Sequence, residues 1–414
     1  ITRYPYDPKY PEKLSRPPVN VEIGYDHITF IIEDAEEKLW IGTPENGINR
    51  YDPATQKITH YGNDADKSGT FNDNSGWCAY ATSNGLIWLG TQEDHLFKID
   101  LYNVSIPHFE LEFRVNSLYQ EASSVFWMGT NRGLMIADLE KETFEQFVHE
   151  PMNPGSLSNT FVRKVMKDHL GVLWIGTSFG LNRYEADNKT FTQFLHDPTD
   201  TTSLSENNIS AIYEDSDSNL WVGTSAGGLN LLDRTTGKFT HYRKDDKNPS
   251  SISNDQVTAI VEDKENNLWI GLSFNAGVNR MNKKTGEFKQ YLRGHIINDL
   301  YEDSGGILWA GTVNGLYRYN KNTDDFSPLG GESNGIRIDS YVMAIIDDDE
   351  GNLWVSTLNG IYKLNKTRER LIRFGKENGV VMIDADRLAL RSGYKTNDGK
   401  LFFSDWNGYY SFYP

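Results

Sequence analysis

The stretch that decides the fold is LWIGT at Leu39–Thr43, which returns as LWIGT at Leu173–Thr177, LWVGT at Leu220–Thr224 and LWAGT at Leu308–Thr312. A ninth, eroded copy reads LFFSD at Leu401–Asp405. Tryptophans of this phrase recur roughly every 39 to 48 residues, at Trp40, Trp88, Trp127, Trp174, Trp221, Trp269, Trp309 and Trp354. A repeat of this period is a supersecondary unit that buries its apolar face only by stacking on its neighbours. The phrase therefore predicts a repeat protein.

One repeat, Asn207–Tyr242, divides into four short strands. The runs NISAIYED (Asn208–Asp215), LWVGT (Leu220–Thr224), LNLLD (Leu229–Asp233) and FTHY (Phe239–Tyr242) are separated by turns rich in Gly, Asn, Asp and Ser. Such spacing is typical of an antiparallel meander, and no stretch has a sustained helical period. Four-stranded meanders repeated around an axis are the blades of a β-propeller. We therefore predict an all-β fold, a β-propeller of four-stranded antiparallel blades.

The ends of the chain predict how the ring closes. Fourth-strand sequences begin with ITRY at Ile1–Tyr4, which lacks a unit of its own, and the chain ends at GYYSFYP, a unit that lacks its fourth strand. Pairing these ends would close the last blade and hide both sheet edges. We therefore expect one nine-bladed propeller over 1–414. The alternative is a remnant of a preceding propeller at 1–114 and a seven-bladed propeller at 115–414.

The whole chain resembles the two-component-regulator propeller repeat, and Ile31–Tyr61 (IIEDAEEKLWIGTPENGINRYDPATQKITHY) matches its consensus almost throughout. This repeat occurs chiefly in the sensor regions of hybrid two-component systems of Bacteroides-type bacteria. The resemblance implies a periplasmic or extracellular location and, for many such sensors, a response to polysaccharide breakdown products. It also implies homodimerisation through the parent sensor. The chain has no kinase motif and no β-sandwich domain, and the family supplies no universal binding motif.

Composition excludes several functions. A net charge of −17 argues against nucleic acid or an anionic membrane surface as partner. No apolar run approaches the length of a membrane span, so we expect no membrane insertion by this segment. Cys78 is the only cysteine, which excludes an intrachain disulfide. No signal peptide precedes Ile1, and we expect the sequence to be a mature or excised piece.

Positions that recur in every repeat are predicted to be scaffold. The acidic pairs, such as Glu214–Asp215 and Glu262–Asp263, fall at the turn between first and second strands, where Asp accepts backbone hydrogen bonds. The histidines His60, His108 and His241 share one fourth-strand position. No metal-ligand spacing and no nucleotide-binding or nucleophile motif appears, so we expect no metal and no cofactor.

Positions that vary from blade to blade are free for function. The starts of the first strands and the turns between second and third strands should share one mouth of the central channel. Aromatic planes, amides and charges around a concavity suit a polyhydroxylated ligand. Trp77 and Trp406 stand outside the tryptophan register, and we expect Trp406 to be the main stacking platform. The candidate ligand-binding residues are His27, Trp77, Arg114, Arg132, Phe179, Asn208, Gln256, Phe274, His295, Tyr341 and Trp406.

These residues favour a ligand-sensing module that binds oligosaccharide and relays a signal without covalent chemistry. The first alternative is a propeller-type polysaccharide lyase or hydrolase, for which His27, His295 and Tyr341 are the only general acid–base trio on offer. The second alternative is a protein-interaction scaffold, which a large apolar surface patch would favour.

Overall fold

The computed structural model describes residues 28–34, 36–44, 47–61, 76–82, 86–91, 96–100, 106–330, 336–380, 392–405 and 407–414. Its strands are all antiparallel, and the helical structure in the described ranges is one short 3-10 turn, Lys376–Asn378. The chain divides into two compact units, Ile1–Ser105 and Ile106–Pro414. The expected all-β fold of four-stranded antiparallel blades is confirmed.

The first unit contains two sheets, one of four strands and one of three. Their inner faces share a small core around Trp40, Ile48, Ile87 and Leu89. The strands are β1 Phe30–Glu33, β2 Leu39–Gly42, β3 Ile48–Tyr51 and β4 Ile58–Tyr61 in one sheet, and β5 Gly76–Ala81, β6 Leu86–Thr91 and β7 Leu96–Asp100 in the other.

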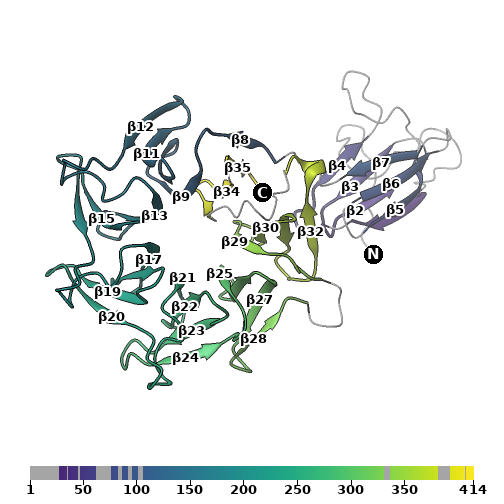
Figure 1. Ribbon diagram of the computed structural model, residues 1–414. Helices are drawn as coiled ribbons and strands as arrows, with labels where there is room; N and C mark the ends of the chain where they lie inside the picture. The colour runs from purple at the N-terminus through teal and green to yellow at the C-terminus, as the bar shows by residue number, and fades with distance from the viewer. Residues whose placement is uncertain are drawn as a thin grey trace, which may run out of the picture. The chain divides into compact units, whose positions relative to one another are not determined.

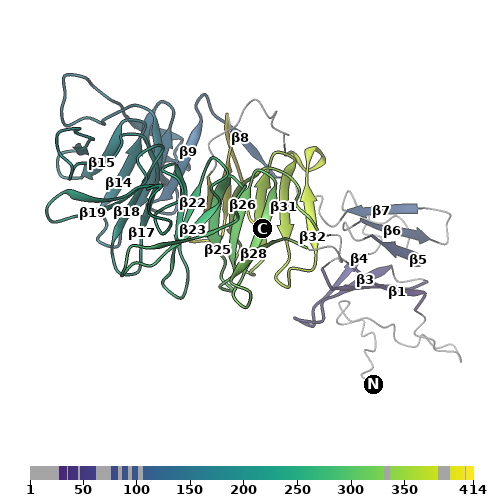
Figure 2. The same cartoon turned by 60° about the horizontal axis from the view of Figure 1, so that its bottom comes forward.

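The second unit is a ring of seven four-stranded sheets, with the first strand of each sheet innermost (Figure 1). Figure 2 shows the strands of these sheets running from one face of the ring to the other. We number the sheets as blades 1 to 7 in chain order. Blades 1 to 3 comprise β9 Val115–Gln120, β10 Val125–Thr130, β11 Gly133–Asp138 and β12 Thr143–Phe147; β13 Val162–Lys167, β14 Leu173–Thr177, β15 Gly180–Glu185 and β16 Thr190–Phe194; and β17 Ile209–Glu214, β18 Leu220–Thr224, β19 Leu229–Asp233 and β20 Lys238–Tyr242.

Blades 4 to 7 repeat this order until the last sheet. They comprise β21 Val257–Glu262, β22 Leu268–Leu272, β23 Val278–Met281 and β24 Phe288–Tyr291; β25 Ile297–Glu302, β26 Leu308–Thr312, β27 Gly315–Asn320 and β28 Asp325–Pro328; β29 Val342–Asp347, β30 Leu353–Thr357, β31 Gly360–Leu364 and β32 Leu371–Phe374; and β33 Gly393–Lys395, β34 Leu401–Ser404, β35 Gly408–Phe412 with β8 His108–Glu110.

Blade 7 corrects our prediction of how the ring closes. Its outer strand is β8, which pairs with β35, so the place that we gave to Ile1–Tyr4 is taken by His108–Glu110. Residues 1–27 lie outside the described ranges, but β35 has no free edge left for them. β8 leads directly into β9, so the strand that completes blade 7 comes immediately before blade 1 in the chain. A single nine-bladed ring is therefore wrong.

The boundary between the units lies at Ser105, earlier than the 114/115 boundary of our alternative division. Residues 106–114 belong with the second unit, since Ile106 is buried there and Phe109 stacks on Tyr409 with ring centroids 5.1 Å apart. That the first unit belongs to a preceding propeller stays a prediction.

The repeated tryptophan forms the core between blades. Trp221 of blade 3 is buried in one cluster with Val257 and Ile270 of blade 4, and Trp269 of blade 4 lies with Ile297 of blade 5 in the next. The glycine of the same phrase lets the blades approach, because a Cβ on Gly176 would lie 2.5 Å from the Ile209 side chain of the next blade. In the second unit the phrase is therefore scaffold, as its repetition predicted, whereas Trp88 of the first unit is 37% exposed and departs from that prediction.

Candidate functional site

The starts of the first strands and the turns between second and third strands lie at one end of the ring, which we call the mouth. In blades 1 to 6 one backbone hydrogen bond joins these two places. The residue after the last residue of the LWIGT-type phrase donates its amide to the carbonyl of the residue that starts the first strand. The pairs are Asn131 to Arg114, Ser178 to Phe161, Ser225 to Asn208, Ser273 to Gln256, Val313 to Ile296 and Leu358 to Tyr341, at 2.9–3.3 Å. The shared face that the sequence predicted is therefore present in the second unit.

Eight of the eleven candidate residues lie at this mouth in the described part of the chain. Trp77 lies in the first unit on β5, where it is 51% exposed at a bulge between Gly76 and Cys78. His27 and Trp406, our preferred stacking platform, lie outside the described residues. The residues that the ring brings to the mouth are Arg114, Arg132, Phe179, Asn208, Gln256, Phe274, His295 and Tyr341.

A hollow of about 320 Å³ opens at the mouth beside blade 1. The guanidinium of Arg114 lies over the ring of Phe161, 5.4 Å from its centroid, and Arg114 Nε donates to Asn116 Oδ1 at 3.1 Å. Burial lowers the pKa of the Arg114 guanidinium. The residues that line this mouth hollow are Leu111, Glu112, Phe113, Arg114, Asn131, Phe161 and Asn407. An aromatic plane, two amides and a fixed cation therefore share one concavity.

Sequence reasoning missed Phe161 as a site residue, although it occupies the aligned position that gave Arg114 and Asn208. The signal was present, because Phe161 is an aromatic residue at an aligned first-strand start, as Tyr341 is in blade 6. Arg132 lies at the rim, where its guanidinium is 3.6 Å from the Glu112 carboxylate and both side chains are more than half exposed. A pair so exposed contributes little to stability.

Two cations below the mouth were also missed. The register of blade 2 shifts between Val162 and Lys164, which leaves Arg163 as an extra, bulged residue. Burial lowers the pKa of Arg163, the nearby charge of Arg114 lowers it further, and Glu206 opposes both. Burial also lowers the pKa of Lys164, and Asp299 opposes that shift. Both residues lie on the inner strand β13, and both side chains are partly exposed.

Unpaired polar atoms gather on the same end of the ring. In the described residues, Glu206 Oε2 and Asn208 Oδ1 are buried without a hydrogen-bond partner. Leaving such an atom unpaired costs about 1–3 kcal/mol, so proteins rarely do it. Further unpaired buried atoms on blades 3 to 5 belong to Ser205, Ser210, Thr258 and His295. These polar atoms are therefore available to a bound molecule or to water.

Phe274 is held in a strained backbone at the mouth. Its φ is 52° and that of Asn275 is 60°, and the Phe274 side chain is 71% exposed. A bulky residue in the left-handed region costs about 1–2 kcal/mol, and strain of this kind concentrates at functional sites. The turn therefore presents an aromatic ring to solvent at the expense of stability.

Replacing Phe274 by Gly is expected to raise the free energy of unfolding by about 0.5–1 kcal/mol, because Gly adopts this φ without strain. Urea denaturation followed by tryptophan fluorescence measures the change. Leu170→Gly, at the exposed turn on the opposite end of blade 2, is the control and should not stabilise. If Phe274→Gly is less stable than the parent, contacts of the Phe274 ring stabilise the fold by more than the backbone strain costs.

The proposed acid–base trio is not assembled by the described residues. His295 Nε2 lies 2.9 Å from Tyr317 Oη of the same blade, and the two rings are 4.8 Å apart. Tyr317 was not part of our trio, and His27 lies outside the described ranges. The geometry around His295 is therefore a local pair within blade 5.

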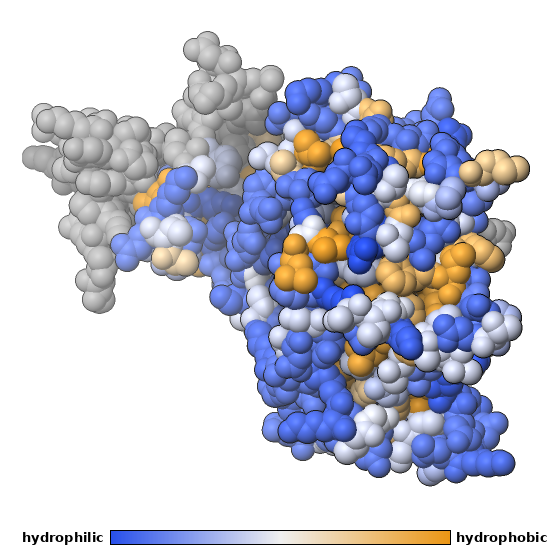
Figure 3. Space-filling view, turned by 90° about the vertical axis from the view of Figure 1, so that its left-hand side faces the viewer, coloured by the Kyte–Doolittle hydropathy of each residue, from blue (hydrophilic) through white to orange (hydrophobic). Residues whose placement is uncertain are grey.

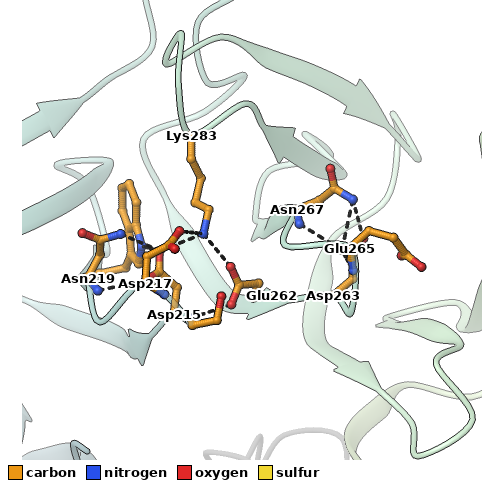
Figure 4. Close-up of polar contacts among 10 residues, drawn as sticks. Asp215, Asp217, Asn219, Glu262, Asp263, Glu265, Asn267 and Lys283 are labelled. Carbon is orange, nitrogen blue, oxygen red and sulfur yellow. Dashed lines mark hydrogen bonds and ion pairs between the residues drawn. The ribbon is translucent and has the colours of Figure 1, made fainter.

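The acidic pairs fall where the first strands end, and so lie at the opposite end of the ring from the mouth. Figure 4 shows Asp215 and Glu262 gathered around Lys283. Asp215 Oδ1 accepts from the backbone amides of Asp217 and Asn219, and Asp215 Oδ2 accepts from Trp221 Nε1 at 2.8 Å. The same contact to the blade tryptophan recurs at Asp34, Asp168, Asp263, Asp303 and Asp348. The interpretation of these residues as turn acceptors is confirmed.

One group at this end has the spacing of a cation site. Ligand oxygens of Asp215, Asp217 and Glu262 lie within 4.8 Å of one another. Lys283 Nζ stands among them, at 3.3, 2.7 and 2.6 Å respectively, and so occupies the place of a metal ion. Because Asp215 belongs to blade 3 and Lys283 to blade 4, the group is an ion pair between neighbouring blades.

The side of the second unit formed by blades 1 to 3 is mostly hydrophilic, and exposed apolar residues interrupt it in several places (Figure 3). Among the described residues, no helix has the length and apolarity that a membrane span requires. The large apolar side chains exposed on these blades and their loops are Phe144, Met152, Leu170, Phe179 and Leu195.

Three segments, residues 203–226, 251–273 and 337–359, match the model of the family described as two component regulator propeller. Each runs from the loop before a first strand to the turn after the second strand. Each therefore contains the repeated phrase of the LWIGT type, which we call the LW phrase. These segments belong to blades 3, 4 and 6 of the second unit. They confirm the resemblance that the sequence suggested.

Solved structures agree on the fold. The extracellular domain assigned to a hybrid two component system of B. thetaiotaomicron is 21% identical, with a TM-score of 0.62 over 93% of this chain and 52% of its own length. A second such domain from that organism is 20% identical, with a TM-score of 0.50 over 100% of this chain and 70% of its own length. The chain thus spans about half the length of the first of these.

Virginiamycin B lyase from Staphylococcus aureus has a TM-score of 0.55 at 13% identity, over 74% of this chain and 97% of its own length. At such identities the likeness shows a propeller fold and nothing about chemistry. No curated protein sequence matches the chain.

Proposed function

We propose that the chain is the ligand-sensing propeller region of an extracytoplasmic, periplasmic or extracellular, regulator of two-component type, and that it binds oligosaccharide at the mouth without covalent chemistry. The two component regulator propeller repeats and the extracellular domains of similar fold support the sensor role. Homodimerisation through the parent sensor belongs to the same proposal.

The observation that carries the proposal is the mouth hollow. The face of the Phe161 ring that Arg114 does not cover is the one available to the C–H face of a sugar. The side chains of Asn131 and Asn407 offer donors and acceptors for its hydroxyls. Arg114 is already fixed over Phe161 by its bond to Asn116, so it loses little side-chain entropy on binding. A preformed hollow with one stacking plane and convergent polar groups is the usual form of such a site.

The first test is calorimetric titration of the whole chain with plant and host oligosaccharides, with an assay for cleavage products in the same samples. We expect saturable binding of an intact sugar. Phe161→Ala should weaken that binding about tenfold or more, because one ring contact and its buried area contribute about 1.5 kcal/mol. Leu170→Ala, at the opposite end of the same blade, is the matched control and should bind as the parent does.

Equal affinity of Phe161→Ala and the parent for the sugar would exclude the mouth hollow as the binding site. Release of shortened or unsaturated products would instead favour the propeller-type polysaccharide lyase or hydrolase, and would direct attention to His295 and Tyr317.

A further inference from the structure

The inner strands carry a repeated pair of positions at the β-bulge below the mouth. The second position of the pair lies opposite the glycine of the LW phrase, or opposite Ser356 in blade 6. In blades 1 to 6 the pairs are Asn116–Ser117, Arg163–Lys164, Ser210–Ala211, Thr258–Ala259, Asn298–Asp299 and Met343–Ala344. Blade 2 alone among these places two cations at the pair.

In blades 1 and 5 the side chains of the pair form hydrogen bonds to the inner strand of the next blade. Asn116 Nδ2 donates to the Val162 carbonyl of the next blade at 2.6 Å, and Ser117 Oγ accepts from the Val165 amide at 3.1 Å. In blade 5 the Asn298 side chain likewise donates to the inner strand of blade 6, and Asp299 accepts from it. These side chains satisfy backbone groups that the edge of an inner strand would otherwise leave unpaired.

In blade 2 the two positions of the pair make no such hydrogen bonds to the next blade. Neither Arg163 nor Lys164 makes a hydrogen bond or an ion pair within the described part of the chain, and the contacts known for them are longer-range charge interactions. Alanine suffices at the position of Lys164 in blades 3, 4 and 6. The scaffold therefore does not require these cations, and a partly buried charge without an ion-pair partner destabilises the fold.

The acids near this pair are already engaged in part. Glu206 Oε1 accepts from the Asn208 amide at 2.7 Å, and Asp299 accepts from the Ile345 amide at 2.9 Å. Arg114 adds a third positive charge at the mouth. A protein of net charge −17 thus places three cations close together at one end of the ring. A group of cations attracts anions over a distance and binds them through charge-assisted hydrogen bonds.

We propose that Arg163 and Lys164 form a subsite for an anionic group, carboxylate or sulfate, of the oligosaccharide that enters through the mouth. This inference rests on the proposed function and names the class of ligand. Arg163 binds such an oxyanion through a planar fork of donors, and Lys164 adds a compact charge. The unpaired hydroxyls of Ser210 and Thr258 lie at the bulge positions of blades 3 and 4 and supply further contacts to the sugar.

The experiment titrates the whole chain with neutral, uronate-containing and sulfated oligosaccharides of matched length. We expect binders among the acidic sugars only, and at least a tenfold loss when the carboxylate is methyl-esterified or the sulfate removed. Whichever of these two changes abolishes binding identifies the anion. The double variant Arg163→Gln/Lys164→Gln should lose at least tenfold in affinity for the acidic sugar and lose its dependence on salt.

Lys284→Gln, an exposed lysine at the opposite end of the ring, is the charge control and should bind within twofold of the parent. Without ligand, the double variant should melt about 2 °C above the parent, because two poorly solvated charges are removed. A lower melting temperature would show that the cations support the fold and would overturn the inference.

The two proposals fail in different ways. A neutral sugar that binds equally to the parent and the double variant leaves the proposed function standing and overturns the anion subsite. A panel in which no sugar binds overturns both.

Discussion

Removing residues 1–110 is expected to lower the melting temperature of the second unit by roughly 8 °C relative to removing residues 1–105. The longer deletion takes away β8, the fourth strand of blade 7. It loses the buried Ile106, the stacking of Phe109 on Tyr409 and the contact of His108 with Asp405 at 2.9 Å. Burial of Ile106 contributes about 1.5–3 kcal/mol, the ring pair about 1 kcal/mol and the strand ladder a similar amount. About 4 kcal/mol corresponds to roughly 8 °C in a unit of this size.

Differential scanning calorimetry of the two fragments measures this difference. The fragment that begins at Ile106 is the control, since it retains all seven four-stranded sheets. The longer deletion should also expose the edge of β35 and promote self-association through it. Equal melting temperatures would contradict closure of the ring by β8.

Replacing Asp215 by Ala is expected to lower the free energy of unfolding by about 3–5 kcal/mol. Its side chain is fully buried and receives bonds from Trp221, from two backbone amides and from Lys283 of the next blade. Removing it leaves the indole N–H and the turn amides without a partner and Lys283 without its buried carboxylate. Denaturant unfolding of the variant and the parent measures the loss.

Asp217→Ala is the matched control, because Asp217 also contacts Lys283 but its side chain is 61% exposed. We expect it to cost less than 1 kcal/mol. Burial alone would raise the pKa of Asp215, but hydrogen bonds from Trp221 and Asn219 outweigh it and hold that pKa below 3.8. The stability that Asp215 contributes is thus present above pH 3.8 and is lost as the pH falls through its folded-state pKa, so the variant should approach the parent there. Similar losses for the two variants at pH 7 would refute a special role for Asp215.

Much of this fold could be predicted from the sequence because the blades repeat the same strand and turn sequences. The LW phrase, the turn aspartate and the close-packed glycine are needed in every blade, so their recurrence identified them as scaffold. How the ring closes could not be predicted in this way, because ITRY at Ile1–Tyr4 and PHFE at Pro107–Glu110 are both suitable outer strands for the last blade. Which of them pairs with β35 depends on chain connectivity and on the burial of Ile106, neither of which a repeat pattern expresses.

The site could be predicted only in outline. Alignment of the first-strand starts placed Arg114, Asn208 and Gln256 at one mouth, and the turn hydrogen bonds confirm that placement. Arg163 was missed because its position lies inside the first strand, two residues after the aligned strand start, and the sequence does not show that this position is a bulge. Which of the aligned residues surround one hollow depends on side-chain packing between blades 7, 1 and 2, which the sequence does not encode position by position.

Hydrogen–deuterium exchange of the whole chain, with and without a saturating oligosaccharide, tests most directly the claim that the mouth is the binding face. The account predicts slower exchange in the segments around Leu111–Arg114, Asn131 and Phe161. It predicts unchanged exchange in the turns at the opposite end, such as Asp168–Val172 and Asp215–Asn219. Protection confined to those opposite turns, or to the first unit, would contradict it.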